Sequence, residues 1–172
     1  MMENIYSKIS VVTIPRFKIA KYIVISKEPE DESIAYMERW ADRNGLNQMD
    51  GYTKRKIGWD FPASKQQSAQ FGLHGYVAAM ILPDDFEPKA GGAEIVFVEE
   101  DTYATLTITD PMREPWKRIP TGFQKLMRSG KPKTLAWEDR VCDSWGNRIA
   151  FEEFYTKDGV EYMDLFVPIA DN

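Results

Sequence analysis

The chain has 172 residues, of which 43% are apolar and 28% charged, and its net charge is −5. This length suits one ordinary domain, and the composition is typical of soluble globular proteins, so it indicates neither disorder nor a membrane span. A pI near 5.0 and the lack of any lysine and arginine run argue against nucleic-acid binding, because neutralising phosphates needs a basic face. The first ten residues carry no apolar leader, so we expect a cytoplasmic protein.

Cys142 and His74 are the only cysteine and the only histidine. One thiol cannot form an internal disulfide, and these two residues cannot supply the ligands of a zinc site. Nucleophilic catalysis through a histidine would depend on His74 alone, with no nucleophile motif beside it, so we interpret His74 as a structural or loop residue. We expect no metal site and no cofactor.

The first half of the chain predicts the order β-α-β-β. Alternating, β-branched residues predict a strand over residues 8–25, interrupted near Pro15. Acidic residues 28–32 then lead into an apolar stripe at helical spacing that stops at Asn44-Gly45, which predicts an amphipathic helix. Two further strands, separated by a glutamine-rich polar loop, are predicted over 53–61 and 75–82.

The second half repeats this order. A long run rich in threonine and valine predicts a strand over 94–109. Apolar residues at spacings of three and four over 116–126 predict a helix that ends around Ser129-Gly130, before Pro132. Residues 135–141 and 149–155 predict one long hairpin arm or two strands, and 160–169 predicts the closing strand. The aromatic residues at helical spacing are interpreted as core: Trp40, Trp116 and Phe123.

Two offsets suggest that the halves arose by duplication. Phe17 and Tyr103 occupy similar places in the opening strands, 86 residues apart, while Pro83 and Pro168 end the closing strands, 85 residues apart. Chance is the alternative, because strands and helices alternate in many small domains.

The predicted fold is therefore α+β, with one domain over residues 1–172 and pseudo-repeats over about 8–83 and 93–169. Two such β-α-β-β units would join their strands into one curved antiparallel sheet with both helices on one face. We expect a ligand groove between the halves.

Six segments, taken in order along nearly the whole chain, resemble one known family. They are Ile57-Gly58-Trp59-Asp60-Phe61-Pro62, residues 71–79, Gly91-Gly92-Ala93-Glu94, Thr102-Tyr103-Ala104, Phe151-Glu152-Glu153-Phe154-Tyr155 and residues 162–169. On these segments the chain resembles the GyrI-like small-molecule-binding domains, relatives of the effector-binding domains of AraC- and MerR-type bacterial transcription regulators. The resemblance implies paired β-α-β-β units with the ligand bound between them.

The resemblance also implies a glutamate at the ligand site, in a strand pattern of the form Glu-x-aromatic. Glu153-Phe154-Tyr155 matches this pattern, and Glu152 is the alternative. Strand alternation places Phe151, Glu153 and Tyr155 on one face and Glu152 and Phe154 on the other. We therefore choose Glu153, with Phe151 and Tyr155 beside it, although without the resemblance a solvated strand carboxylate is the better interpretation.

The remaining ligand-binding candidates are aromatic residues of neighbouring strands: Trp59, Phe61, Tyr76 and Phe166. A carboxylate among aromatic rings attracts cations, and planar apolar molecules stack on the rings. For Trp59 and Tyr155, a place in the pocket and a place in the core are equally compatible with the sequence.

Three functions fit this site. The leading one is binding of small lipophilic, aromatic molecules, including cationic ones, by a stand-alone sensor or a multidrug-sequestering protein. The alternative is hydrolysis of strained electrophiles of the cyclopropane type, with Glu153 as general base and Tyr155 as proton donor. A third is inhibition of gyrase through protein contact.

The regulators in the family carry a helical DNA-binding region, whereas the similarity here begins close to Met1. We therefore expect no direct DNA binding and no membrane partner, and leave a protein partner or a homodimer open. Residues 137–147 form a longer and more polar segment than the resemblance predicts, and we assign it no role.

Overall fold

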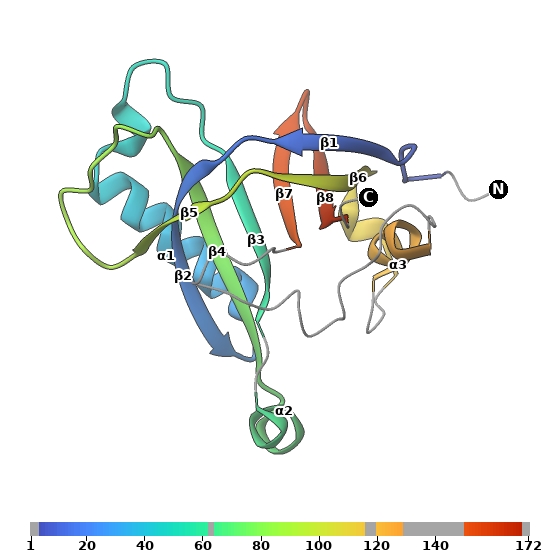
Figure 1. The fold of residues 1–172 in the computed structure, drawn as a ribbon. Coiled ribbons are helices and arrows are strands. Elements are labelled where there is room, and N and C mark those ends of the chain that lie inside the picture. Colours follow the sequence, from blue (N-terminus) through green and yellow to red (C-terminus); the bar gives the residue numbers. More distant parts are fainter. Residues whose placement is uncertain (1–3, 62–63, 116–119, 129–149, 170–172) are drawn as a thin grey trace. The chain divides into compact units, whose positions relative to one another are not determined.

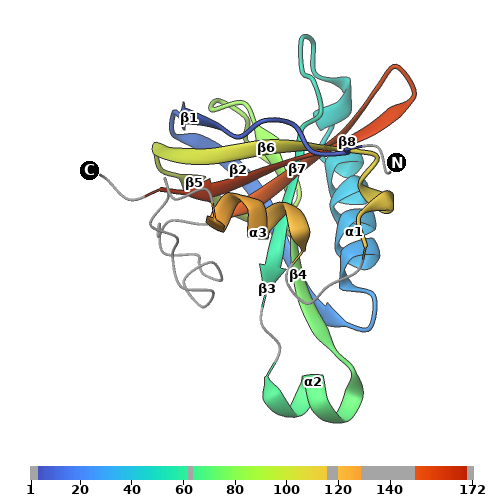
Figure 2. The same cartoon turned by 90° about the vertical axis from the view of Figure 1, so that its right-hand side faces the viewer.

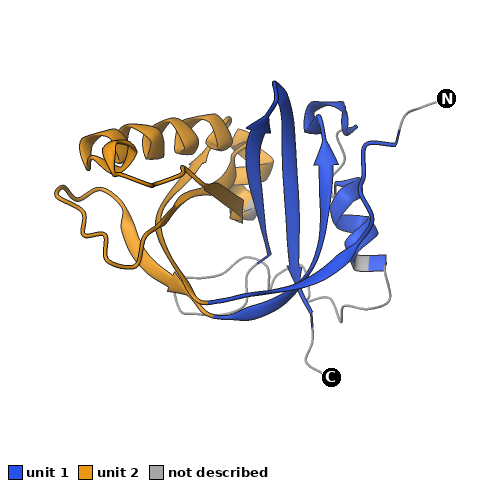
Figure 3. Ribbon diagram, turned by 90° about the horizontal axis from the view of Figure 1, so that it is seen from above, with its two compact units in different colours: residues 1–15, 100–143, 147–172 blue, residues 16–99, 144–146 orange. Residues whose placement is uncertain are grey.

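The structure, a computed structural model, describes residues 4–61, 64–115, 120–128 and 150–169. These residues form two units (Figure 3). Of the described residues, unit 1 holds 4–15, 100–115, 120–128 and 150–169, and unit 2 holds 16–61 and 64–99. The predicted strand at 135–141, Cys142, Trp116 and the segment 137–147 lie outside the described residues.

Unit 2 is an antiparallel sheet with a helix packed on one face. Its elements are β2 (Phe17–Ser26), α1 (Pro29–Arg43), η1 (Leu46–Gln48), β3 (Lys56–Phe61), α2 (Lys65–Phe71), β4 (His74–Leu82) and β5 (Glu94–Val98). The strands lie in the order β3-β4-β2-β5, and every neighbouring pair is antiparallel. The helix α1 runs beside these strands (Figure 1).

Unit 1 repeats this plan. Its elements are β1 (Ser10–Ile14), β6 (Asp101–Thr109), η2 (Pro111–Arg113), α3 (Thr121–Arg128), β7 (Phe151–Lys157) and β8 (Val160–Pro168). Its strands lie in the order β7-β8-β6-β1, again antiparallel, and α3 crosses one face of them (Figure 2). The α+β class and the duplicated antiparallel arrangement predicted from the sequence are confirmed.

The two long opening strands each break into two. The predicted break near Pro15 is confirmed, because it separates β1 from β2. The run over 94–109, predicted as one strand, is in fact β5 and β6, separated at Glu99-Glu100. The break matters because β5 pairs with β2 in unit 2, whereas β6 belongs to unit 1. The break thus divides the run into one strand for each unit.

The prediction of a glutamine-rich loop between β3 and β4 is wrong, because this segment contains the helix α2. Ser64 accepts a hydrogen bond from the Gln67 amide at 3.0 Å, and the Gln67 side chain accepts one from the Ser64 amide at 2.8 Å. This reciprocal capping box starts the helix, and Gly72, with φ of 62°, ends it. The helix is short and largely polar, so hydrophobic periodicity could not reveal it.

The register of the strands agrees with the offsets in the sequence. Tyr103 lies opposite Pro168, and Lys18 lies opposite Leu82, so that the next pair outward from Lys18 is Phe17 and Pro83. Each unit therefore places an aromatic residue of its long strand against the proline of its closing strand. Positions in the two units can be compared by counting inward from these pairs.

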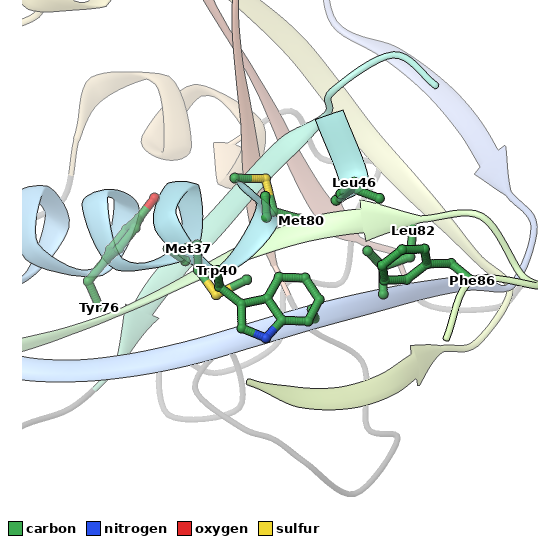
Figure 4. Packing of buried hydrophobic residues seen from close by; sticks show 10 residues of the cluster. Met37, Trp40, Leu46, Tyr76, Met80, Leu82 and Phe86 are labelled. Atoms are coloured by element: carbon green, nitrogen blue, oxygen red, sulfur yellow. The ribbon is translucent and has the colours of Figure 1, made fainter. Parts of the chain in front are cut away.

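The helix covers one face of the sheet in each unit and buries that unit's core. In unit 2, Trp40 and Met37 of α1 pack on sheet residues such as Met80, and Phe86 meets the Trp40 ring edge-on at 6.4 Å (Figure 4). In unit 1 the core residues are Ala104, Leu106, Ile108, Phe123, Leu126, Ala150, Leu165 and Val167. The core positions predicted for Trp40 and Phe123 are confirmed. We call the opposite side of each sheet its second face.

Candidate ligand-binding site

The second face of unit 1 carries the residues expected around Glu153. Successive side chains of a strand point to opposite faces, and the core residues Leu165 and Val167 face α3. The intervening residues therefore lie on the second face. Across β7 and β8 they form directly opposed pairs, of which three make up the row described below: Phe151 with Phe166, Glu153 with Asp164, and Tyr155 with Tyr162.

Aromatic rings close one end of this row. Phe151 and Phe166 stack with their ring centroids 4.7 Å apart and their planes at 19°. Tyr103 of β6 meets both rings edge-on, at 5.4 Å from Phe151 and 6.0 Å from Phe166. All three side chains are buried. Such a cluster gives the face a rigid apolar end.

Two carboxylates occupy the middle of the row. Glu153 is half-buried on β7 and lies directly opposite Asp164 of β8. Thr107 Oγ1 donates a hydrogen bond to Asp164 Oδ1 at 2.6 Å, and the Tyr155 hydroxyl donates to the same oxygen at 3.1 Å. These two donors fix the orientation of the Asp164 carboxylate and leave it a second oxygen that neither of them uses.

Tyrosines form the other end. Tyr155 and Tyr162 stack with ring centroids 5.5 Å apart, and Tyr155 remains 38% exposed. Partial burial and the negative charge of Asp164 raise the pKa of Tyr155 to about 12. The hydroxyl therefore keeps its proton at neutral pH and acts as a hydrogen-bond donor.

The other candidates lie in unit 2. Trp59 and Phe61 share a face of β3, and Trp59 lies opposite Val77 on the second face. Tyr76 lies on the opposite side, because alternation groups it with Ala78 and Met80 beneath α1 (Figure 4). Tyr76 is 2% exposed and packs over Gly58, whose missing side chain makes room for the ring. We therefore treat Tyr76 as core and leave it out of the candidate site.

Asp164, Tyr162 and Thr107 are the residues that the sequence analysis missed. The sequence did contain a signal for two of them. Asp158 and Gly159 both have positive φ, at 52° and 77°, as in a two-residue hairpin turn, and an Asp-Gly pair is a typical sequence for that turn. Such a turn fixes the register and so sets Asp164 opposite Glu153.

The histidine His74 belongs to unit 2 and not to the row in unit 1. His74 opens β4 on the surface, with Nε2 3.2 Å from the Glu30 carboxylate. Within the described ranges no group of three His, Cys, Asp or Glu residues is placed to hold a metal ion. None of the described helices is long and apolar enough to cross a membrane.

Comparison with known proteins finds similarity of structure only. No family model and no curated protein matches the sequence. Among solved structures, a hydrolase from Listeria innocua matches with a TM-score of 0.56 and 9% identity, over 95% of this chain and 92% of that one. The EcmrR C-terminal domain matches with a TM-score of 0.54 and 12% identity, over 96% and 98%.

A further match is EcmrR in a complex with DNA, with a TM-score of 0.54 and 11% identity, where the likeness covers 96% of this chain and 59% of EcmrR. At such low identities these likenesses establish the fold. The chain therefore has the fold that the resemblance to GyrI-like domains implies.

Proposed function

We propose that the chain binds small lipophilic, aromatic molecules, including cationic ones, at the second face of unit 1. The observation that carries this proposal is the row itself, in which the Glu153–Asp164 pair lies between stacked Phe151 and Phe166 on one side and stacked tyrosines on the other. Rings and carboxylates both attract a cation, and the Tyr155 ring, which is 38% exposed, offers apolar surface to its substituents.

Electrostatics favours a positively charged ligand at this position. Like charges directly opposite each other in a sheet destabilise it, so a cation placed between Glu153 and Asp164 relieves a repulsion as well as forming new attractions. The Glu153–Asp164 pair lies two residues along the strands from each aromatic pair, which is a distance of about 7 Å. A cationic centre with aromatic groups on both sides fits this spacing.

The resemblance to GyrI-like domains supports the same class of function, since the members bind small molecules. We propose that the chain works in the bacterial cytoplasm as a sensor or a multidrug-sequestering domain, without a cofactor. Its net charge of −5 supports a function that requires no direct contact with nucleic acid. Trp59 and Phe61 remain proposed as additional ligand-binding residues.

Titration calorimetry with a cationic triarylmethane dye and its uncharged leuco form tests the proposal. We expect the dye to bind at least tenfold more tightly than the leuco form, a difference of about 1.4 kcal/mol. Glu153→Gln and Asp164→Asn should each remove most of this preference. The matched control is Glu161→Gln, because Glu161 is exposed and lies on the same strand as Asp164. The proposal is contradicted if the dye fails to bind, or if both variants bind it as tightly as the unchanged chain does.

Hydrolysis is a second candidate, favoured by the Tyr155 hydroxyl that lies beside the two carboxylates. The substrate would be a cyclopropane conjugated to a carbonyl. Glu153 would take a proton from a water molecule while the water oxygen attacks a ring carbon. The electrons of the broken carbon–carbon bond would move to the carbonyl oxygen, and Tyr155 would turn from Asp164 to protonate that oxygen.

Mass spectrometry distinguishes hydrolysis from binding. Hydrolysis predicts a product heavier by one water, formed faster than without protein and lost in Glu153→Gln. If the electrophile disappears only at its uncatalysed rate, this candidate is wrong and the binding proposal is unaffected.

A further inference from the structure

One edge of β2 is unpaired over half of the strand. On one side β4 pairs with β2 over residues 18–26, whereas on the other side β5 pairs only with residues 17–21. Residues 22–26 therefore border no described strand on the side of β5, and this part of β2 runs on past the start of β5 (Figure 1). We call residues 22–26 the open edge.

Strand alternation shows which main-chain groups point outward at the open edge. The Ile81 amide donates a hydrogen bond to the Arg55 carbonyl oxygen at 3.0 Å, on the β3 side of β4. Main-chain groups alternate between the two sides of an antiparallel strand, so the register of β2 and β4 directs Val24 toward β4 and both Ile23 and Ile25 outward. The amide and carbonyl groups of these two isoleucines thus have no hydrogen-bond partner among the described residues.

The side chains of the open edge are apolar and partly exposed. Ile23 and Ile25 lie on the second face, and each is 37% exposed. The open edge contains no charged residue and no proline, which commonly prevent edge strands from pairing with other chains. The edge strand β5 differs, because the Arg16 guanidinium lies over its Phe97 ring, 3.8 Å from the centroid. The open edge is therefore suited to adding a strand.

The open edge is complementary to a second copy of itself. In an antiparallel pair, residues that exchange main-chain hydrogen bonds lie directly opposite each other. If a twofold axis passes through Val24, Ile23 of each copy lies opposite Ile25 of the other, and the outward groups of both residues are paired. The same register sets isoleucine against isoleucine on the second face, which removes apolar surface from water. A register shifted by two residues would pair only one isoleucine of each copy.

Charges at the ends of the open edge support this register. Lys27 follows the open edge and is exposed, and Glu94, which opens β5 opposite Lys21, is 52% exposed. With the axis at Val24, Lys27 of one copy comes into line with Lys21 of the other, where β5 begins. Lys27 of each copy would therefore meet Glu94 of the other, and opposite charges at such a contact favour the correct partner and register.

We propose that the chain forms a twofold-symmetric dimer, in which the open edges of two copies pair as antiparallel strands about Val24. The occupant of the open edge is thus a second copy of this chain. The dimer involves residues of unit 2 alone and does not depend on the binding site proposed for unit 1.

Sedimentation equilibrium of the full chain tests the proposal. We expect the dimer fraction to rise with protein concentration from the micromolar to the millimolar range. Ile25→Pro should abolish the dimer and leave the circular dichroism spectrum unchanged, because proline removes an outward amide and no bond to β4. Ile23→Lys should weaken dimerisation at least tenfold, because it replaces an apolar contact by a charge. The matched control is Val11→Lys, at a 47% exposed position of β1, which should leave the dimer unchanged.

Disulfide formation tests the register. Cys142→Ser first removes the native cysteine, which is the only one in the chain. In that background Val24→Cys should form a disulfide-linked dimer on mild oxidation, because opposed residues that exchange no hydrogen bonds have Cα atoms about 4.5 Å apart. Ile23→Cys is the matched control and should crosslink at least tenfold more slowly, since Ile23 lies opposite Ile25 and not opposite itself.

Several results would overturn the proposal. A chain that stays monomeric at every concentration does so, and leaves the open edge to an extended segment of another protein. So does a dimer that survives in both Ile25→Pro and Ile23→Lys, or one that Val11→Lys abolishes. Crosslinking as fast through Ile23→Cys as through Val24→Cys also contradicts it. If Ile25→Pro does not fold, the result for Ile23→Lys decides.

Discussion

The two units share a fold but differ on their second faces. In unit 1, the residues four positions inward from the Tyr103–Pro168 pair are Thr107 and Asp164. Glu153 lies opposite Asp164 on the next strand. The same count in unit 2 gives Lys21, Ala79 and Ile57. At equivalent places one unit therefore has two carboxylates, and the other has one buried lysine among apolar side chains.

The hydrophobic clusters beneath the helices show much less contrast, since both consist of aliphatic and aromatic residues packed against a helix. Packing against a helix tolerates only residues that fill the same space, whereas the face away from the helix can change its chemistry without loss of the fold. The difference teaches that the two units share the chemistry of their cores and differ in the chemistry of their second faces. If so, substitutions in the cores should affect stability and those on the second faces should affect ligand choice.

Trp40→Ala should have the largest effect and tests the first half of that statement. Trp40 is fully buried in unit 2 between α1 and the sheet, so truncation leaves a large cavity. We expect the free energy of unfolding to fall by about 3–5 kcal/mol. Urea denaturation followed by circular dichroism measures it, with Met112→Ala, at an 85% exposed position, as control. A loss below about 1 kcal/mol would show that this core is not tightly packed.

Gly58→Ala sharpens the comparison at a place where the helix-covered faces do differ. A Cβ at Gly58 would overlap the Tyr76 ring, whereas the equivalent residue of unit 1 is Phe154, which lies opposite Met163. We expect overpacking to cost about 1–3 kcal/mol in the free energy of unfolding. Gly91→Ala is the control, because a Cβ there meets nothing within 4 Å. Equal stability of the two variants would mean that Tyr76 can move aside freely.

Much of the fold follows from local patterns in the sequence. The break at Pro15, the helix ending before Gly45 and the last two strands, β7 and β8, were predictable, because alternation, helical spacing and turn residues all agree there. The polar helix α2 was not, since its start depends on a reciprocal hydrogen bond between Ser64 and Gln67 rather than on apolar spacing. Neither was the break in 94–109, which reflects pairing with distant strands.

The candidate site was predictable only in part. Alternation correctly placed Phe151, Glu153 and Tyr155 on one face, because the strand period is a property of the backbone. It could not show which face of β4 the helix α1 covers, and Tyr76 was therefore grouped with the site. Asp164 required the register of β7 and β8, which is a property of two strands and not of one.

Tyr155→Phe has the smallest expected effect and tests the polar face of unit 1 directly. It removes one of two hydrogen bonds to Asp164 and should cost about 1 kcal/mol at neutral pH, since Thr107 still holds the carboxylate. Trp59 occupies the equivalent position in unit 2. There Trp59→Phe should not alter the pH dependence, because an indole does not titrate.

The sign of that pH dependence follows from the tyrosine. The pKa of Tyr155 is raised from 10.0 to about 12 in the folded chain, so its contribution to stability is complete below pH 10 and is lost as the pH rises toward about 12. Burial, together with the hydrogen bond to Glu114, raises the pKa of Tyr6 to about 12, and this adds to the same loss. Urea unfolding across this range should therefore show a shallower decline in Tyr155→Phe and in Tyr6→Phe than in the unchanged chain, and the shallowest in the double variant. A decline as steep in Tyr155→Phe as in the unchanged chain would mean that Asp164 does not hold the Tyr155 proton, and the carboxylate would then be oriented by Thr107 alone.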